Sequence, residues 1–198
     1  MNILFIDTET TGLDPHTSAI VDIACEYWEN GQQKSKFQRF IDLDTSSKTV
    51  KNLKALQINH YTTMLPNVSV TDNIAVDEFV TYLLSIPNSK NVPVYIGGHN
   101  TSFDVNMISA WLSRHHYTGL NEVFSSTLID TAALAVTLRD TGLLDIDRIN
   151  LVALAQKLEV PVNASKAHRA DYDVKLTAQC YYKMQSLLKD LGSYGKVK

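Results

Sequence analysis

The most constraining feature of the sequence is a pair of carboxylates two residues apart at the end of an apolar run. Residues 3–6 read Ile-Leu-Phe-Ile, and Asp7 and Glu9 follow directly. In an extended strand, residues i and i+2 point to the same side, so these two carboxylates would face together and repel each other. A cation beside them removes that conflict. The sequence therefore predicts a cation site at the end of a buried strand.

Two later segments supply further groups suited to such a site. Residues 99–104 read His-Asn-Thr-Ser-Phe-Asp and end in a third acid, Asp104. Residues 167–173 read Ala-His-Arg-Ala-Asp-Tyr-Asp, so His168 is followed five residues later by Asp173. Carboxylate oxygens suit Mg²⁺ or Mn²⁺ better than they suit softer metals. An imidazole titrates near neutrality and can accept a proton from water.

Asp7, Glu9, Asp104 and Asp173, in that order and joined by His168, resemble the DEDD superfamily of 3′-to-5′ exonucleases. The histidine, rather than a tyrosine, resembles the DEDDh branch, which includes the proofreading epsilon subunit of bacterial DNA polymerase III and ribonuclease T. The resemblance covers nearly the whole chain. It implies an α/β ribonuclease H-like fold, with a central mixed β-sheet flanked by α-helices. Each acid alone would also suit a turn or the first turn of a helix.

The resemblance also implies a role for each of these residues. It implies two divalent cations, Mg²⁺ or Mn²⁺, held by Asp7, Glu9, Asp104 and Asp173. Asp7 would bridge both ions, Glu9 and Asp173 would complete the site that activates the attacking water, and Asp104 would hold the ion that stabilises the leaving 3′ oxygen. His168 would take the proton. Because five residues do not return to the same helix face, we expect His168 on the loop before the last helix.

Substrate contacts implied by the resemblance involve Thr10, Leu13, Tyr61, Asn100 and Phe103. A backbone amide at Thr10 would meet the terminal 3′-hydroxyl, and Leu13 would pack on the last base, although an ordinary turn would also explain both residues. Residues 60–63 read His-Tyr-Thr-Thr where related chains often read His-Gly-Ile-Thr. Tyr61 therefore either stacks on a base or has a structural role.

Some polar residues and thiols have no role implied by the resemblance. Asp171 lies where the family commonly has an apolar residue, and we favour a solvated acid on a helix face. The alternative is a partner for a metal or for Arg169. Cys25 and Cys180 are the two cysteines of the chain, and we expect buried free thiols rather than a disulfide.

The hydrophobic pattern predicts strands first and interleaved helices later. Strands are expected over residues 3–7, 19–28, 36–43, 92–96 and 127–129, with Asn30-Gly31 as a two-residue hairpin turn. Helices are expected over residues 50–58, 74–86, 103–116, 131–139 and 151–158. A last, long helix, which His168 opens or immediately precedes, is expected to run to about residue 191, where Gly192 would end it. This order predicts a mixed α/β sheet in one exonuclease domain over residues 1–192, followed by a short tail over residues 193–198.

Charge and the N-terminal sequence limit the function classes. The formal net charge of −3 argues against a protein that coats duplex nucleic acid. An enzyme that grips a few nucleotides at one end through metal ions needs no such charge. The N-terminus has no secretion signal, and no apolar run approaches the ~20 residues that span a bilayer. We therefore predict a cytoplasmic location and no membrane partner.

The sequence thus predicts a metal-dependent 3′-to-5′ exonuclease. It would hydrolyse terminal phosphodiester bonds of single-stranded or frayed DNA by a two-metal-ion mechanism and release 5′-mononucleotides. Trimming of RNA 3′ ends is the alternative, because the catalytic motifs do not read the 2′-hydroxyl. A non-catalytic nucleic-acid-binding module is disfavoured, because all five catalytic positions carry the expected residue types. A polymerase partner and a homodimer are both left open.

Overall fold

The structure, a computed structural model, describes residues 1–42, 69–88, 93–117 and 124–194. Its strands are β1 (Asn2–Thr10), β2 (Ile20–Glu29), β3 (Gln32–Phe40), β4 (Val94–Gly98) and β5 (Leu128–Asp130). Its helices are α3 (Asp72–Ser85), α4 (Thr101–Arg114), α5 (Thr131–Asp140), α6 (Leu151–Lys157) and α7 (Ala170–Tyr194), with a short 3₁₀ turn η2 (Ala164–Lys166). None of the helices in these ranges has the length and apolar character needed to cross a membrane.

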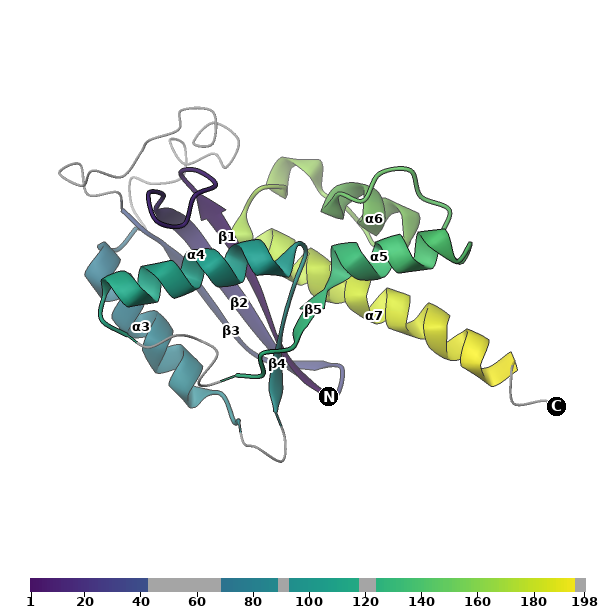
Figure 1. The fold of residues 1–198 in the computed structure, drawn as a ribbon, viewed down its shortest axis with the longest axis horizontal. Helices are drawn as coiled ribbons and strands as arrows, with labels where there is room; N and C mark the ends of the chain where they lie inside the picture. Colours follow the sequence, from purple (N-terminus) through teal and green to yellow (C-terminus); the bar gives the residue numbers. More distant parts are fainter. Residues whose placement is uncertain (43–68, 89–92, 118–123, 195–198) are drawn as a thin grey trace.

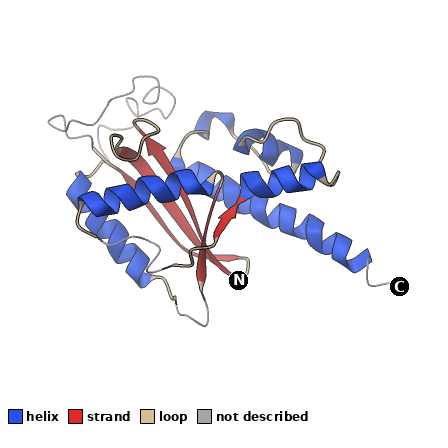
Figure 2. Ribbon diagram, viewed as in Figure 1, coloured by secondary structure: helices blue, strands red, loops and turns tan. Residues whose placement is uncertain are grey.

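The strands form one mixed sheet in the order β3-β2-β1-β4-β5. The pairs β1–β2 and β2–β3 are antiparallel, whereas β1–β4 and β4–β5 are parallel. Helices α3 and α4 lie on one side of the sheet, and α5, α6 and α7 lie on the other (Figures 1 and 2). The predicted α/β architecture, a mixed sheet flanked by helices, is confirmed.

Alternate residues of β1 belong to different hydrophobic cores. Leu4 and Ile6 are buried in the core formed with α3 and α4, whereas Ile3 and Phe5 are buried in the core formed with α7. A further core joins α5, α6 and α7. Because side chains in a strand alternate with period two, the parity of Ile3 and Phe5 continues to Asp7 and Glu9. Both carboxylates therefore lie on the face of the sheet that α7 covers.

The unequal lengths of β1 and β4 create the space for a site. β1 pairs with β2 along its full length, as far as Thr10 opposite Ile20. Its pairing with β4 ends at Phe5 opposite Gly97. Beyond that point, the β4 side of β1 has no neighbouring strand within the described ranges. Backbone N–H groups on that side are therefore available to side chains of the α4 helix.

The predicted hairpin turn is confirmed, but the strand that follows it begins earlier than predicted. Asn30 has φ 51° and Gly31 has φ 83°. Positive φ at both central residues is characteristic of a two-residue turn whose twist matches that of the flanking strands. Because such a tight turn reverses the chain at once, Gln32 already pairs with Glu29. The predicted start of this strand at residue 36 was therefore too late.

The end of the last helix also differs from the prediction. α7 continues through Gly192 to Tyr194, so Gly192 does not end the helix. A glycine within a helix costs only about 1 kcal/mol relative to alanine, which a long helix can accommodate. The division between a domain over residues 1–192 and a tail remains a prediction. The helix predicted over residues 50–58 lies outside the described residues.

Candidate active site

Asp104 reaches the end of β1 from the first turn of α4. Its side chain is buried, and its Oδ1 accepts hydrogen bonds from the Thr8 N–H at 2.9 Å and the Thr8 hydroxyl at 2.6 Å. The Thr8 N–H is available because the pairing of β1 with β4 ends at Phe5. These two bonds attach the carboxylate to the strand that also carries Asp7 and Glu9.

The start of α4 is held by Asp130, a residue that the sequence analysis missed. The Asp130 carboxylate accepts the backbone N–H groups of Asn100 at 3.0 Å and Thr101 at 3.2 Å. It also caps α5, because the N–H groups of Ala132 and Ala133 donate to its Oδ1 at 2.9 and 3.4 Å. An acid before a helix is a visible N-cap signal, but its reach to a second helix is not. One side chain thus fixes the starts of α4 and α5.

His168 lies just before α7, as expected. Its side chain is exposed and its φ is 63°, in the left-handed region that few residues other than glycine occupy. The His168 N–H donates to Asp173 Oδ2 at 3.0 Å. Asp173 belongs to the first turn of α7. This bond folds the histidine loop back over the start of the helix.

The structure brings the five predicted catalytic residues together at the end of β1. One ligand atom from each of Glu9, His168 and Asp173 lies within 4.8 Å of the others. Burial raises the pKa of Asp7 well above its usual range, and the charges of Asp104, Glu9 and Asp173 raise it further. Such mutual effects require the four carboxyl groups to be close to one another.

Burial is the main cause of the raised pKa at each of the other three acids. It raises the pKa of Glu9 to about 8, with the charge of Asp173 as the next cause. Burial also raises the pKa of Asp104 to about 7, against the hydrogen bonds from Thr8 that lower it. The pKa of Asp173 is raised to about 6, against the hydrogen bond from His168. A nearby cation would reverse these shifts, because it favours the charged carboxylates.

The donor set fits a hard divalent cation. Asp173 Oδ1 is buried and has no hydrogen-bond partner among the described residues. A buried carboxylate oxygen without a partner is costly, and coordination to a cation would satisfy it. Four carboxylates are oxygen donors of the kind that Mg²⁺ and Mn²⁺ prefer. The residues present therefore fit the group that the resemblance implies.

Asp22 is a fifth acid beside the cluster and was also missed by the sequence analysis. It lies opposite Glu9 in the β1–β2 register and is 4% exposed. Its Oδ2 accepts the Ala170 N–H at 3.1 Å, and Gln38 Nε2 donates to its Oδ1 at 3.3 Å. Burial raises the pKa of Asp22 to about 7. Because Ala170 begins α7, Asp22 positions the turn that carries His168.

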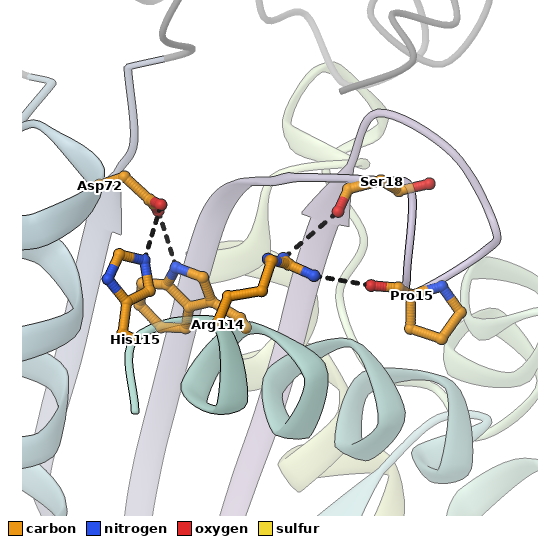
Figure 3. A network of polar contacts seen from close by, with 6 residues as sticks. Pro15, Ser18, Asp72, Arg114 and His115 are labelled. Carbon is orange, nitrogen blue, oxygen red and sulfur yellow. Dashed lines mark hydrogen bonds and ion pairs between the residues drawn. The ribbon is translucent and has the colours of Figure 1, made fainter. Parts of the chain in front are cut away.

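The loop between β1 and β2, residues 11–19, presents Leu13 to solvent and is hydrogen-bonded to α4. We call it the Leu13 loop. Leu13 is 84% exposed, although it is a large apolar residue. The Arg114 guanidinium donates to the Pro15 carbonyl at 2.8 Å and the Ser18 carbonyl at 3.4 Å (Figure 3). The same helix therefore supports Asp104 at its start and the Leu13 loop near its end.

The end of α4 is in turn attached to the start of α3. Asp72 Oδ1 accepts the Trp111 indole N–H at 2.7 Å, and Asp72 Oδ2 lies 2.8 Å from His115 Nε2 (Figure 3). Trp111 is 1% exposed and packs in the core between the sheet, α3 and α4. These contacts fix the position of the helix whose Arg114 holds the Leu13 loop.

The other predicted substrate residues differ in how far they are exposed and in what they contact. The Thr10 hydroxyl donates to the Gly12 carbonyl at 2.7 Å, within the loop that carries Leu13. Asn100 is exposed at the start of α4, with φ 66°. Phe103 is half-buried against the core formed with α3 and α4. Tyr61 lies outside the described residues. Contacts of these side chains with a nucleic acid remain predictions.

The side chain of Asp171 is paired and is not simply a solvated acid on a helix face, the interpretation that we favoured from the sequence. Arg169 Nε lies 3.1 Å from Asp171 Oδ1, so the two side chains form an ion pair. The structure thus supports the alternative, in which Asp171 is a partner for Arg169. Cys25 and Cys180 are both free and buried, as predicted.

The metal-free protein is expected to lose stability as the pH rises. The pKa values of Glu9, Asp104 and Asp173 are about 8, 7 and 6. Carboxyl groups in an unfolded chain titrate near pH 4, so the folded state binds more protons. The contribution of these acids is fully present below about pH 4 and is lost as the pH rises through their folded-state pKa values. Thermal unfolding in chelator at about pH 5.5 and about pH 8.5 measures the effect.

Two additions make that measurement specific to the site. The Glu9→Gln variant should show a smaller fall in Tm with pH, and Mg²⁺ should raise the Tm more at the higher pH. Each 1 kcal/mol moves the Tm of a domain of this size by about 2–4 °C. A metal-free protein that is more stable at the higher pH would contradict the raised pKa values.

Comparison with known proteins connects this geometry to a family. An exonuclease family model, RNase_T, matches residues 4–181. The chain is 31% identical over 192 residues to the PolC-type DNA polymerase III of Ureaplasma parvum, and 28% identical over 189 residues to that of Staphylococcus aureus. These alignments cover 96% and 94% of this chain but only 12% and 11% of the polymerases.

Solved structures of Exonuclease I have the same fold. The Escherichia coli enzyme in complex with a dT13 oligonucleotide matches with a TM-score of 0.75 and 15% identity, covering 98% of this chain and 43% of that one. Exonuclease I from Methylocaldum szegediense matches with a TM-score of 0.72 and 16% identity, covering 92% of this chain and 40% of that one. The predicted ribonuclease H-like fold is thereby confirmed. The chain belongs to the exonuclease family, within the DEDD superfamily of 3′-to-5′ exonucleases.

Proposed function

We propose that this chain hydrolyses the terminal phosphodiester bond at the 3′ end of single-stranded or frayed DNA and releases 5′-mononucleotides. The observation that carries the proposal is the convergence of Asp7, Glu9, Asp104 and Asp173 with His168 at the end of β1. Membership of the exonuclease family supports the reaction class. A cytoplasmic location remains a prediction from the sequence.

Each residue of the site has a proposed task. Asp7, Glu9, Asp104 and Asp173 would hold two divalent cations, Mg²⁺ or Mn²⁺. When bound, such ions supply Lewis-acid stabilisation of the charge that develops on the reacting phosphate. His168 would accept the proton of the attacking water, because its exposed imidazole lies beside Glu9 and Asp173 and is not enclosed by the core.

DNA is the proposed substrate because the similar proteins are DNA polymerases and an exonuclease solved with DNA. The relatives in sequence are PolC-type DNA polymerases, and one structural neighbour was solved with a dT13 oligonucleotide. The chain spans about an eighth of the Ureaplasma polymerase. Because that relative is a DNA polymerase, we also propose a polymerase as a partner of this chain. RNA is the second candidate, and a direct comparison of the two substrates separates them.

The Leu13 loop is the basis for predicting attack from the 3′ end. It follows Glu9 directly along the chain, and Arg114 holds it in place. Exposed Leu13 can pack on a terminal base. A strand that continued beyond its 3′-hydroxyl would collide with this loop. We therefore expect a 3′-phosphate to slow degradation strongly and a 5′ block to have little effect.

The test uses matched DNA and RNA oligomers labelled at either end, with Mg²⁺ or with chelator. DNA labelled at the 3′ end should release labelled mononucleotide at once, whereas DNA labelled at the 5′ end should shorten progressively. Both reactions should stop in chelator. Efficient cutting of a circular single strand would overturn the assignment, and faster degradation of RNA would replace DNA as the substrate.

A further inference from the structure

A cavity lies between α7 and the edge strand β3, on the same side of the sheet as Asp7 and Glu9. We call Asp7, Glu9, Asp104 and Asp173 the acid cluster. Its volume is about 550 Å³. Ala24 of β2 and Val174 of α7 are among the small side chains that line it. Lysines from three separate elements line it as well: Lys36 of β3, Lys166 of η2 and Lys175 of α7. We call this cavity the β3–α7 groove.

Two other charged groups at the groove are neutralised by ion pairs. Arg39 lines the groove, but its guanidinium is bonded to Glu78 of α3. Asp171 also lines it, but its carboxylate is paired with Arg169. Neither side chain therefore adds much net charge. The charge of the groove depends mainly on the three lysines and on one remaining acid.

That acid is Glu26, which balances only part of the positive charge. It is 6% exposed and lies opposite Lys36 in the β2–β3 register. Its Oε2 accepts the Trp28 indole N–H at 3.0 Å. Burial raises the pKa of Glu26, whereas the charges of Lys175 and Lys36 lower it. Three lysines against one buried acid make the groove positive, although the chain carries a net charge of −3.

The groove adjoins the elements that carry the catalytic residues. Lys166 precedes His168 by two residues, and Lys175 follows Asp173 by two. On α7, Val174 faces the sheet. With about 100° between successive helix residues, Asp173 and Lys175 lie on opposite sides of Val174. The acid cluster and the groove therefore flank the first turns of the same helix. A single nucleic-acid strand that crosses the start of α7 would pass from one to the other.

We propose that the β3–α7 groove binds phosphates of the single strand on the 5′ side of the scissile bond. This inference rests on the proposed exonuclease function. Lysines contributed by three elements complement a chain of evenly spaced negative charges. An acidic segment of a partner protein would complement the same charges, but the position of the groove beside His168 and Asp173 favours the substrate strand.

The test compares a long and a short substrate. The long one is an oligothymidylate of roughly 16 nucleotides, the upper end of single-strand site sizes. The short one is the p-nitrophenyl ester of thymidine 5′-monophosphate, which reaches the acid cluster and cannot reach the groove. The variant is Lys36→Gln with Lys175→Gln. The readout is the ratio of kcat/KM for the long substrate to kcat/KM for the short one, together with its dependence on salt.

A matched control removes the same charges from the same two elements. Lys34 of β3 and Lys183 of α7 are exposed and do not line the groove. In the groove variant, the ratio should fall about tenfold at low salt, and the slope of log KM against log salt should fall by about 1.4, or about 0.7 per lost phosphate contact. In Lys34→Gln with Lys183→Gln, the ratio and the slope should match the parent.

The outcomes separate this inference from the function on which it rests. A parent protein that hydrolyses neither substrate with Mg²⁺ would refute the proposed exonuclease function. A parent that hydrolyses both, with the same ratio and salt slope in the groove variant, would overturn the groove as a strand-binding site. That second result is also the one expected if an acidic protein segment occupies the groove.

Discussion

Replacing Asp7 with Asn is expected to lower turnover by about 10³-fold, the scale of losing one central electrostatic group in an active site. Asn has nearly the same volume as Asp but cannot carry the charge that holds a cation. The fold should persist, because the carboxylate is destabilising in the metal-free protein. Burial and the charge of Asp104 both raise the pKa of Asp7, so ionising it costs free energy. In chelator, the Tm of Asp7→Asn should therefore exceed that of the parent.

Single-turnover hydrolysis of a labelled oligomer measures the loss of turnover, and thermal unfolding in chelator measures the rise in Tm. Asp22→Asn is the matched control, because it makes the same change at a buried acid of the neighbouring strand. An asparagine there can still accept the Ala170 N–H, so most of the activity should remain. Undiminished hydrolysis by Asp7→Asn, or full activity of the parent in chelator, would exclude the metal-dependent mechanism.

His168→Ala is expected to slow the chemical step by about 10²- to 10⁴-fold, the usual contribution of a general base. The imidazole is the group removed, whereas the His168 N–H that bonds to Asp173 belongs to the backbone and remains. Cation binding by the acids should therefore change little. Pre-steady-state rates at saturating Mg²⁺, with the Mg²⁺ dependence measured in parallel, separate the two effects.

His116→Ala provides the control for that experiment. His116 is also exposed and has φ 62°, close to the φ of 63° at His168. Any general cost of placing alanine in the left-handed region is therefore common to both variants. Only His168→Ala, which removes the proposed general base, should slow hydrolysis. Equal losses in the two variants would assign the effect to backbone strain and the base to another group.

Several parts of the fold and of the site were predictable because they depend on local geometry. The facing arrangement of Asp7 and Glu9 follows from the period of a strand, and Asn30-Gly31 has the backbone freedom that a two-residue turn requires. Asn150 lies directly before α6 and caps it through an equally local contact, because its Oδ1 accepts the Ala153 N–H at 2.9 Å. In each case, the interacting groups lie within a few residues of one another.

Other parts depend on contacts between distant segments. The bonds between Thr8 and Asp104 join residues 96 positions apart, and the bond from Ala170 to Asp22 joins residues 148 apart. Asp130 was recognisable as an acid before a helix, but its bonds to the start of α4 depend on β4 and β5 pairing side by side. A strand period shows which face a side chain takes and does not show which segment covers that face.

The sequence by itself determined the order and the chemical types of the catalytic candidates, and the face of the strand on which Asp7 and Glu9 lie. Only the tertiary structure decided how closely the acids approach, that Asp22 and Asp130 hold the starts of the helices beside them, and that lysines from β3, η2 and α7 line one groove. The physical reason is that side-chain direction follows from local backbone geometry, whereas proximity follows from the register of the sheet and from the packing of helices against it.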